Sequence, residues 1–188
     1  MSLTVIATPI GNPRDIGERA LNFLKKVKFV IGEERRVTET NLKKWGMLDK
    51  EIHLLNEHTT DAELVDLVRV CETNEVALMS DCGTPGFSDP GPRLIAKLRE
   101  KKISVNAIPG ASSLMCLISL SSKPITEFHF RGFLPAGNLA REQAWKNLKG
   151  QRQTFFIMDT PYRLTKTLEE LNLHFADRIV LLGLNMTQ

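Results

Sequence analysis

The sequence predicts an α/β fold built on a mostly parallel sheet with helices on both of its faces. Two observations support this prediction. Short apolar runs rich in β-branched residues alternate with segments of helical spacing up to about residue 120, and such alternation is typical of parallel sheets. Several of these runs also end in turns rich in proline and glycine, at the strand ends where α/β proteins usually bind ligands.

The individual elements follow from apolar spacing and from turn residues. Thr4–Thr8 is a short β-rich run that Pro9 ends, and Asp15 is placed to cap the helix that follows. Strands are expected at residues 4–8, 29–31, 52–54, 76–79, 103–108, 128–130, 154–158 and 178–184. Helices are expected at residues 16–26, 37–45, 62–72, 92–100, 114–120, 140–148 and around 164–171.

The alternation is interrupted once, at Ser121–Pro124, which has the composition of a linker. A chain of 188 residues is long enough for two small domains. We therefore expect an N-terminal α/β domain at residues 1–121 and a C-terminal α/β domain at residues 122–188.

Composition excludes several classes of protein. Hydrophobic residues make up 42% of the chain and charged residues 25%, as in ordinary globular proteins, and a net charge of +3 is only a weak argument for a nucleic-acid partner. The three cysteines form no C-x-x-C pair and the four histidines show no ligand spacing, so no metal site or disulfide framework is expected. No apolar run of 18 residues and no signal peptide are present, which favours a reduced, cytoplasmic setting away from membranes.

The stretch Ser80–Pro92 is the most informative part of the sequence. It holds three glycines and three prolines in 13 residues, between an apolar run and a segment of helical spacing. Such a composition fixes the backbone path and leaves little side-chain bulk over it. A ligand loop at the end of a strand is therefore favoured over an ordinary surface loop.

Two further turns of small residues follow the runs that end at Thr8 and Ile108. If the three strands are neighbours, the backbone groups of their turns line one pocket, which suits an adenosine-like cofactor. None of the turns has the G-x-G-x-x-G or the G-x-x-x-x-G-K-[ST] pattern. A dinucleotide site and a P-loop are therefore disfavoured.

Candidates for catalysis are few. Cys82 lies in the long loop, but the sequence places no base beside it. His58 is the one histidine in a polar loop, whereas His129 alternates with two phenylalanines on an expected strand and is better explained as structural. Glu33–Arg36 follows an expected strand, where a solvated strand end and a functional role are about equally well supported.

Four motifs together resemble one family. They are Thr8–Pro13, the S-D-x-G-T-P-G-x-S-D-P-G loop from Ser80 to Gly91, Ile108–Ser112 and Gly132–Pro135. In this order and spacing they resemble the S-adenosylmethionine-dependent 16S rRNA (cytidine-2′-O)-methyltransferases of the tetrapyrrole methylase superfamily. The resemblance runs from about Val5 to the C-terminus and implies two α/β domains, with the cofactor in the cleft between them, in a homodimer.

The resemblance also implies a set of cofactor-binding residues, carried over by matching position. The first turn, the long loop and the third turn contribute most of them, and the second domain closes the pocket. The implied residues are Pro9, Ile10, Asp81, Thr84, Phe87, Ser112, Ser113, Met158, Leu184 and Met186.

Methylation of a ribose hydroxyl needs a group that removes the proton as the oxygen attacks. The candidates for this base, or for orienting the substrate, are Glu33, Glu34, Asp81 and His58, and the sequence does not choose among them. Basic side chains that could meet RNA phosphates are those of Arg14, Arg36, Arg93 and Arg163.

The chain departs from the family at the segments on the substrate side. Glu33–Arg36 replaces Glu-Asp-Thr-Arg, Asp159–Arg163 replaces Glu-Ser-Pro-His-Arg, and Leu184–Gln188 replaces Glu-Leu-Thr-Lys before an early end of the chain. The leading hypothesis is methylation of ribosomal RNA in the small subunit. A methyltransferase of the same fold acting on a tetrapyrrole-like small molecule or a protein, and an inactive cofactor-binding assembly partner, are the alternatives.

Overall fold

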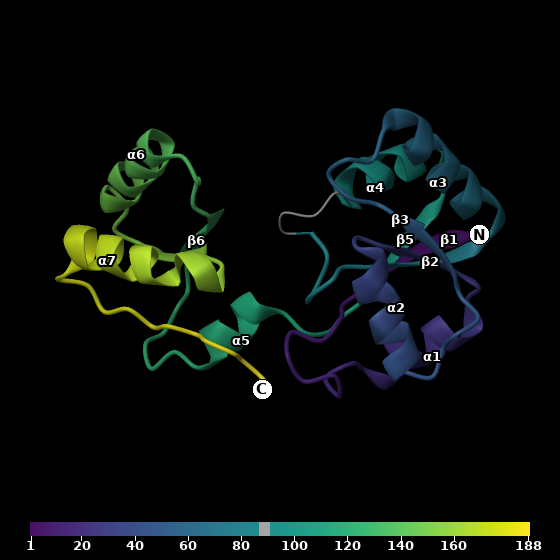
Figure 1. Ribbon diagram of the computed structural model, residues 1–188, viewed down its shortest axis with the longest axis horizontal. Helices are drawn as coiled ribbons and strands as arrows, with labels where there is room; N and C mark the ends of the chain where they lie inside the picture. Colours follow the sequence, from purple (N-terminus) through teal and green to yellow (C-terminus); the bar gives the residue numbers. More distant parts are fainter. Residues whose placement is uncertain (87–90) are drawn as a thin grey trace. The chain divides into compact units, whose positions relative to one another are not determined.

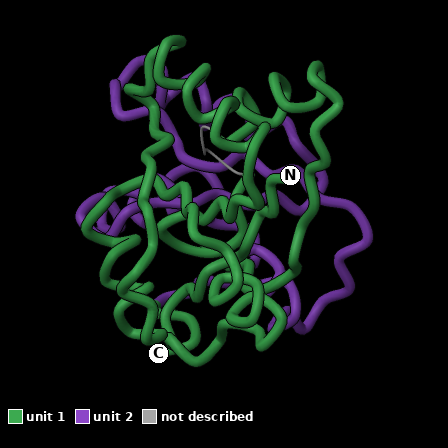
Figure 2. Tube along the Cα trace, turned by 90° about the vertical axis from the view of Figure 1, so that its right-hand side faces the viewer, with its two compact units in different colours: residues 1–113, 185–188 green, residues 114–184 purple. Residues whose placement is uncertain are grey.

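The computed structural model describes residues 1–86 and 91–188. The chain divides into two compact units, which Figure 2 shows in different colours: unit 1 comprises residues 1–113 and 185–188, and unit 2 comprises residues 114–184. The boundary between two domains at residues 121 and 122 stays a prediction.

Unit 1 contains a five-stranded sheet in which every pairing is parallel, as the sequence predicts. The strand order is β3-β2-β4-β1-β5. β4 therefore lies at the centre with β2 and β1 beside it, and a helix connects each strand to the next strand in the chain. The strands are β1 (Ser2–Ile6), β2 (Phe29–Gly32), β3 (Glu51–Leu54), β4 (Glu75–Met79) and β5 (Ser104–Ile108).

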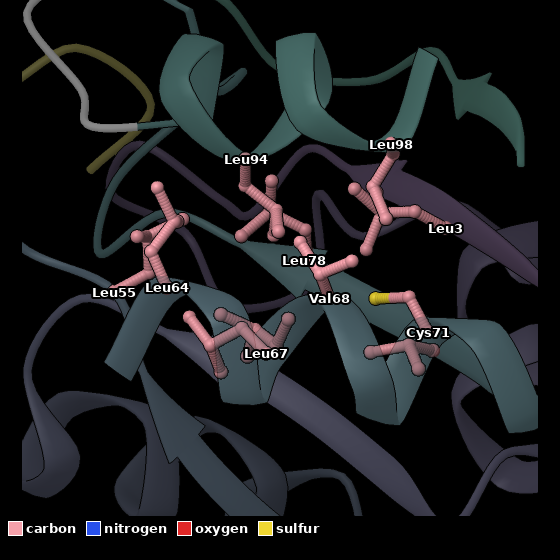
Figure 3. Packing of buried hydrophobic residues seen from close by; sticks show 11 residues of the cluster. Leu3, Leu55, Leu64, Leu67, Val68, Cys71, Leu78, Leu94 and Leu98 are labelled. Carbon is pink, nitrogen blue, oxygen red and sulfur yellow. The ribbon is translucent and has the colours of Figure 1, made fainter. Parts of the chain in front are cut away.

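Helices cover both faces of this sheet, α3 and α4 on one and α1 and α2 on the other (Figure 1). Alternate residues of β4 explain the two layers, because successive side chains of a strand point to opposite faces. Val76 and Leu78 pack in the core under α3 and α4, part of which Figure 3 shows, and Ala77 and Met79 pack in the core on the other side. The helices are α1 (Glu18–Lys26), α2 (Arg35–Lys44), α3 (Asp61–Thr73) and α4 (Gly91–Glu100).

The N-terminal ends of α3 and α1 are capped in different ways. Thr60 forms a capping box with Glu63 at the start of α3. The expected cap at Asp15 is wrong: the helix begins at Glu18 after Gly17, and the backbone N–H of Asp15 instead donates to the carbonyl of Asn12 in a turn. Asp15 therefore belongs to the turn that precedes the helix and not to the start of the helix.

Unit 2 is built on two parallel strands, β6 (Phe128–Phe133) and β7 (Thr154–Met158), with a register shift between Phe130 and Gly132. Its core contains Trp145, Leu148 and Phe175. The helical elements around it are α5 (Ser113–Ser119), which begins at the unit boundary, α6 (Asn138–Lys149), the 3₁₀ turn η1 (Pro161–Arg163) and α7 (Leu164–Phe175).

The strand expected at residues 178–184 is wrong. Within the described residues this segment pairs with no strand, since the sheet of unit 2 consists of β6 and β7. Its apolar side chains are exposed, Ile179 at 85% and Leu184 at 56%. The run has the composition of a strand, but a strand also needs a neighbour to satisfy its backbone groups.

None of the helices in the described ranges combines the length and the apolar character needed to cross a bilayer.

Candidate functional site

The carboxyl ends of β4, β1 and β5 carry the three small-residue turns, and the strand order makes these strands neighbours. The sequence analysis expected one shared pocket only if these three strands were neighbours, and they are. The turns also contact each other: the backbone N–H of Thr8 donates to the carbonyl of Gly83 at 2.8 Å, and the Thr84 hydroxyl donates to the carbonyl of Ala111 at 2.7 Å. We call the edge formed by Thr8–Gly11, Ser80–Gly86 and Pro109–Ser113 the turn cluster.

Two glycines allow this close approach of three backbones. Gly83 has a φ of +84°, a conformation that side chains disfavour. A Cβ on Gly110 would lie 2.8 Å from the Cβ of Ala7, closer than two carbon atoms pack. The turn cluster consequently presents backbone groups with little side-chain bulk over them.

Two carboxylates lie at the same edge, at the ends of the neighbouring strands β2 and β4. The carboxylate of Glu33 accepts from the backbone N–H of Asp81 at 3.1 Å, and that of Asp81 accepts from the backbone N–H of Glu34 at 3.2 Å. The side-chain amide of Asn56, after β3, donates to the carbonyl of Glu33 at 3.4 Å. These bonds hold both carboxyl groups beside the turn cluster. A small pocket lies there, with Glu33, Leu55, Leu78, Met79, Ser80, Pro85 and Gly91 among its walls.

Glu34 has a structural task that the sequence did not indicate. Its carboxylate accepts from the backbone N–H groups of Arg36 and Val37 at 3.1 and 3.2 Å and so caps α2. Proton transfer by Glu34 would compete with these bonds. Glu33 and Asp81 lie at the turn cluster instead, and the role of each of the three carboxylates in catalysis stays a prediction.

The model of the family "Tetrapyrrole (Corrin/Porphyrin) Methylases" matches residues 2–187. The chain belongs to this family.

Three relatives of this chain share the same name. The chain is 33% identical to "Ribosomal RNA small subunit methyltransferase I" of Thermotoga maritima, over 99% of this chain and 83% of that protein. It is 34% identical to the protein of the same name from Micromonospora olivasterospora, over 100% of this chain and 60% of the relative. For the Synechocystis protein the identity is 36%, over 90% of this chain and 61% of the relative. The chain thus spans about three fifths to four fifths of the length of these relatives.

The site residues that the family resemblance implies fall into three groups. Pro9, Ile10, Asp81, Thr84 and Ser112 lie in the turn cluster, and Ser113 ends it as the first residue of α5. Met158 and Leu184 belong to unit 2, at the end of β7 and in the unpaired segment. Phe87 lies outside the described residues. As cofactor contacts, all of these residues stay predictions.

Met186 is brought to the turn cluster although it is far away in sequence. The last four residues of the chain belong to unit 1, and the Thr187 hydroxyl accepts from the backbone N–H of Asn12 at 3.0 Å. The backbone carbonyl of Met186 lies 2.5 Å from where a Cβ on Gly11 would be. Only the family motif could have indicated this proximity.

His58 and the basic candidates are placed differently. The His58 side chain is 86% exposed, and its Nε2 lies 3.5 Å from the carboxylate of Glu57. Arg93 donates to the carbonyl of Thr59 and to the carboxylate of Asp61, which joins α4 to the start of α3. The remaining two candidates of unit 1, Arg14 and Arg36, are exposed. Their contact with RNA stays a prediction.

Unit 2 contains a buried ionic network that no pattern in the sequence indicated. The guanidinium of Arg141, whose side chain is 2% exposed, donates to Glu170 at 2.7 Å and to Asp159 at 3.3 Å. Asp159 also accepts from Arg163 at 2.7 Å, and Arg163 donates to the carbonyl of Leu134 at 3.3 Å. We call Arg141, Asp159, Arg163, Thr167 and Glu170 the arginine network. It ties the loop after β6 to the loop after β7.

The arginine network also sets the charge of Asp159. Burial raises the pKa of this carboxyl, but hydrogen bonds from Thr167, the Thr160 backbone and Arg141, together with the charge of Arg163, outweigh it and lower the pKa below its ordinary value. Asp159 is therefore ionised at neutral pH and pairs with both guanidinium groups.

Within the described residues, no group of three or more His, Cys, Asp and Glu side chains is arranged to hold a metal ion.

Proposed function

We propose that this protein is an S-adenosylmethionine-dependent methyltransferase that modifies the 2′-hydroxyl of a cytidine ribose in 16S ribosomal RNA. Three findings support the proposal: the family match over nearly the whole chain, the shared name of the relatives, and the turn cluster with its two carboxylates. The observation that contributes most is the turn cluster, because it joins all three cofactor motifs at one sheet edge.

The residues present fit the proposed cofactor. A nucleoside needs hydrogen-bonding groups and close approach to the backbone, and the glycines of the turn cluster leave that space. Glu33 and Asp81 supply acceptors for ribose hydroxyls or an ammonium group. When bound, S-adenosylmethionine supplies a methyl group on a positively charged sulfur.

The chain's own contribution is to position the acceptor and to remove its proton. A ribose hydroxyl that attacks a methyl carbon loses its proton as the new C–O bond forms, and a carboxylate within hydrogen-bond reach accepts it. We propose Asp81, with Glu33 beside it, for this task. His58 remains the other candidate. Homodimerisation and a cytoplasmic setting belong to the same proposal.

A second function, methylation of a tetrapyrrole-like small molecule, is favoured by one observation. The family description itself names corrin and porphyrin methylases. The two functions differ in their acceptor, so the acceptor must be tested directly.

The test is transfer of labelled methyl groups into 30S subunits from cells that lack this protein. We expect the wild-type protein to label the 16S RNA. Asp81→Asn should do so at least about 10²-fold more slowly at saturating cofactor, because the amide keeps the acceptor for Glu34 N–H but cannot take a proton. Asp66→Asn, an exposed change on α3, is the matched control and should retain full activity.

Label in a small-molecule extract but not in the subunits would contradict the RNA proposal and favour the second function. If calorimetry detects no binding of S-adenosylmethionine at millimolar concentration, both functions are excluded.

A further inference from the structure

The positive charge of the chain is concentrated in one unit. Residues 114–184 contain nine Lys and Arg against six Asp and Glu, whereas residues 1–113 contain sixteen of each. Unit 2 thus has the whole net charge of +3, and unit 1 is neutral. A net positive charge favours contact between unit 2 and a polyanion.

Within unit 2, the turn η1 presents an aromatic ring to solvent. Tyr162 is 85% exposed and is the only tyrosine of the chain. A single exposed aromatic residue is unremarkable in itself. What distinguishes Tyr162 is that the residues around it are fixed.

The arginine network fixes this turn from both sides. Asp159 accepts from the Thr160 backbone N–H at 2.9 Å before the turn, and from Arg163 at 2.7 Å at its end. Pro161 restricts the backbone between them. The exposed ring is therefore mounted on a rigid support, which reduces the entropy lost when a ligand binds to it.

A cation and an apolar side chain lie close to this turn. Lys166 is four residues after Tyr162, in the first turn of α7, which follows η1 directly, and both side chains are exposed. The Lys166 ammonium donates to the side-chain oxygen of Asn138 at 3.0 Å, which connects α7 to the start of α6. Figure 1 shows these two helices side by side. Leu139, next to Asn138, is 86% exposed.

We propose that the surface formed by Tyr162, Lys166, Asn138 and Leu139, here called the Tyr162 surface, binds a single-stranded segment of the RNA substrate. The Tyr162 ring stacks on an unpaired base, and Lys166 pairs with a phosphate. The proposal rests on the proposed function, to which it adds the part of the chain that holds the RNA.

The combination of groups favours RNA over a protein partner. An exposed aromatic face beside an ammonium group matches the alternation of base and phosphate along a single strand. The net positive charge of unit 2 agrees with this, because a nucleic acid brings many negative charges to the surface.

The test is binding of a fluorescent single-stranded RNA oligonucleotide to the full chain, read by anisotropy. Tyr162→Ala should weaken binding about tenfold, the size of one base–aromatic stack, while Tyr162→Phe should bind within about twofold of the wild type. Lys166→Gln should lower the salt dependence of binding by about one phosphate contact. Leu173→Ala, a change of a 76% exposed residue on α7, is the control and should have no effect.

Methyl transfer into 30S subunits gives an independent reading. Tyr162→Ala should raise KM for the subunits with kcat and S-adenosylmethionine affinity unchanged, because a stack that is present before and during the reaction contributes to binding alone. Unchanged RNA binding by Tyr162→Ala would overturn the proposal, and so would an equal loss in Tyr162→Phe. Weaker binding to intact subunits together with unchanged binding to naked RNA would indicate a protein contact and would also overturn it.

The two proposals fail in different ways. RNA binding that depends on Tyr162, without any methyl transfer by the wild type, contradicts the proposed function alone. Methyl transfer that is identical in wild type and Tyr162→Ala contradicts the Tyr162 surface alone.

Discussion

The two units fix the loops after their strands by different physical means. In unit 1, the turn cluster is joined through backbone groups, as in the bond from Thr8 N–H to the Gly83 carbonyl. In unit 2, buried ion pairs hold the loops in place, and Arg141 pairs with both Asp159 and Glu170. Backbone contacts between small residues leave room for a ligand. A buried ionic network fills its space and holds one arrangement firmly, at the cost of desolvating every charge.

This difference predicts the largest effect in unit 2. Arg141→Met should lower the free energy of unfolding of unit 2 by about 3–5 kcal/mol, because it leaves the carboxylate of Glu170 without its guanidinium partner and that of Asp159 with Arg163 alone. The measurement is urea unfolding followed by Trp145, whose indole N–H donates to Glu170 at 2.9 Å. A Trp45→Phe background removes the one other tryptophan, which lies in unit 1.

The matched control lies on the same helix. Lys146 pairs with Glu142 at 2.8 Å in an exposed i,i+4 arrangement, so Lys146→Met should cost at most about 0.5 kcal/mol. If the two variants lost the same stability, the distinction between a buried network and surface pairs would fail. A stabilised Arg141→Met variant would show that the apolar side chain packs better than the network, as happens when whole buried networks are replaced.

The second prediction concerns the close approach of backbones in unit 1. Gly110→Ala should lower the free energy of unfolding of unit 1 by about 1–3 kcal/mol, because the new methyl group overlaps Ala7. Pulsed labelling of Cys71 in urea reports this unfolding. That cysteine is fully buried in the core of unit 1, and burial raises the pKa of its thiol to about 12.

The same variant should bind S-adenosylmethionine more weakly, since the turn after β5 must shift. Gly17→Ala serves as the control, because a Cβ there meets nothing within 4 Å. It should cost less than about 1 kcal/mol through the N-cap of α1 and should leave cofactor binding unchanged. Equal effects of both variants on cofactor affinity would mean that the approach of Gly110 to Ala7 has no bearing on the site.

The sequence predicted most of unit 1 because the information there is local. Apolar spacing placed all five strands, and proline and glycine marked the turns that the parallel sheet then brought together. The predicted cap of α1 was wrong because Asp15 takes part in a turn with Asn12, and the helix begins only after Gly17. Local signals are reliable when no competing local structure exists.

The sequence predicted much less of unit 2, because its organisation depends on distant pairs. Arg141 and Glu170 are 29 residues apart, and no spacing rule connects an arginine of one helix with a glutamate of another. The segment 178–184 was assigned to a strand on composition, but strand formation depends on a partner that its own residues do not specify. Glu34 illustrates the same limit in unit 1, since its capping role depends on where α2 begins.

The smallest predicted effect is the response of unit 2 to acid. The pKa of Asp159 is lowered in the folded state, so the unfolded chain takes up its proton first as the pH falls. The contribution of Asp159 to stability is complete above the ordinary aspartate value of about 3.9 and is lost as the pH falls below it toward the folded value. Burial acts against the hydrogen bonds on Asp159, so we expect this acid response to be smaller than the effect of removing Arg141.

Salt distinguishes this response from that of surface carboxylates. Hydrogen bonding and the charge of Lys146 lower the pKa of the exposed Glu142, which therefore adds its own acid dependence to unit 2. We expect the acid dependence due to Glu142 to disappear at high ionic strength and in the Glu142→Gln variant. The acid dependence due to buried Asp159 should persist at high ionic strength and in that variant. The measurement is the urea midpoint of unit 2 from pH 6 to pH 3, with and without about 1 M NaCl, an ionic strength at which the Debye length is near 3 Å. If salt abolished the whole loss of stability at low pH, the acid-sensitive charges would lie at the surface. The contrast between backbone contacts in unit 1 and buried charges in unit 2 would then fail.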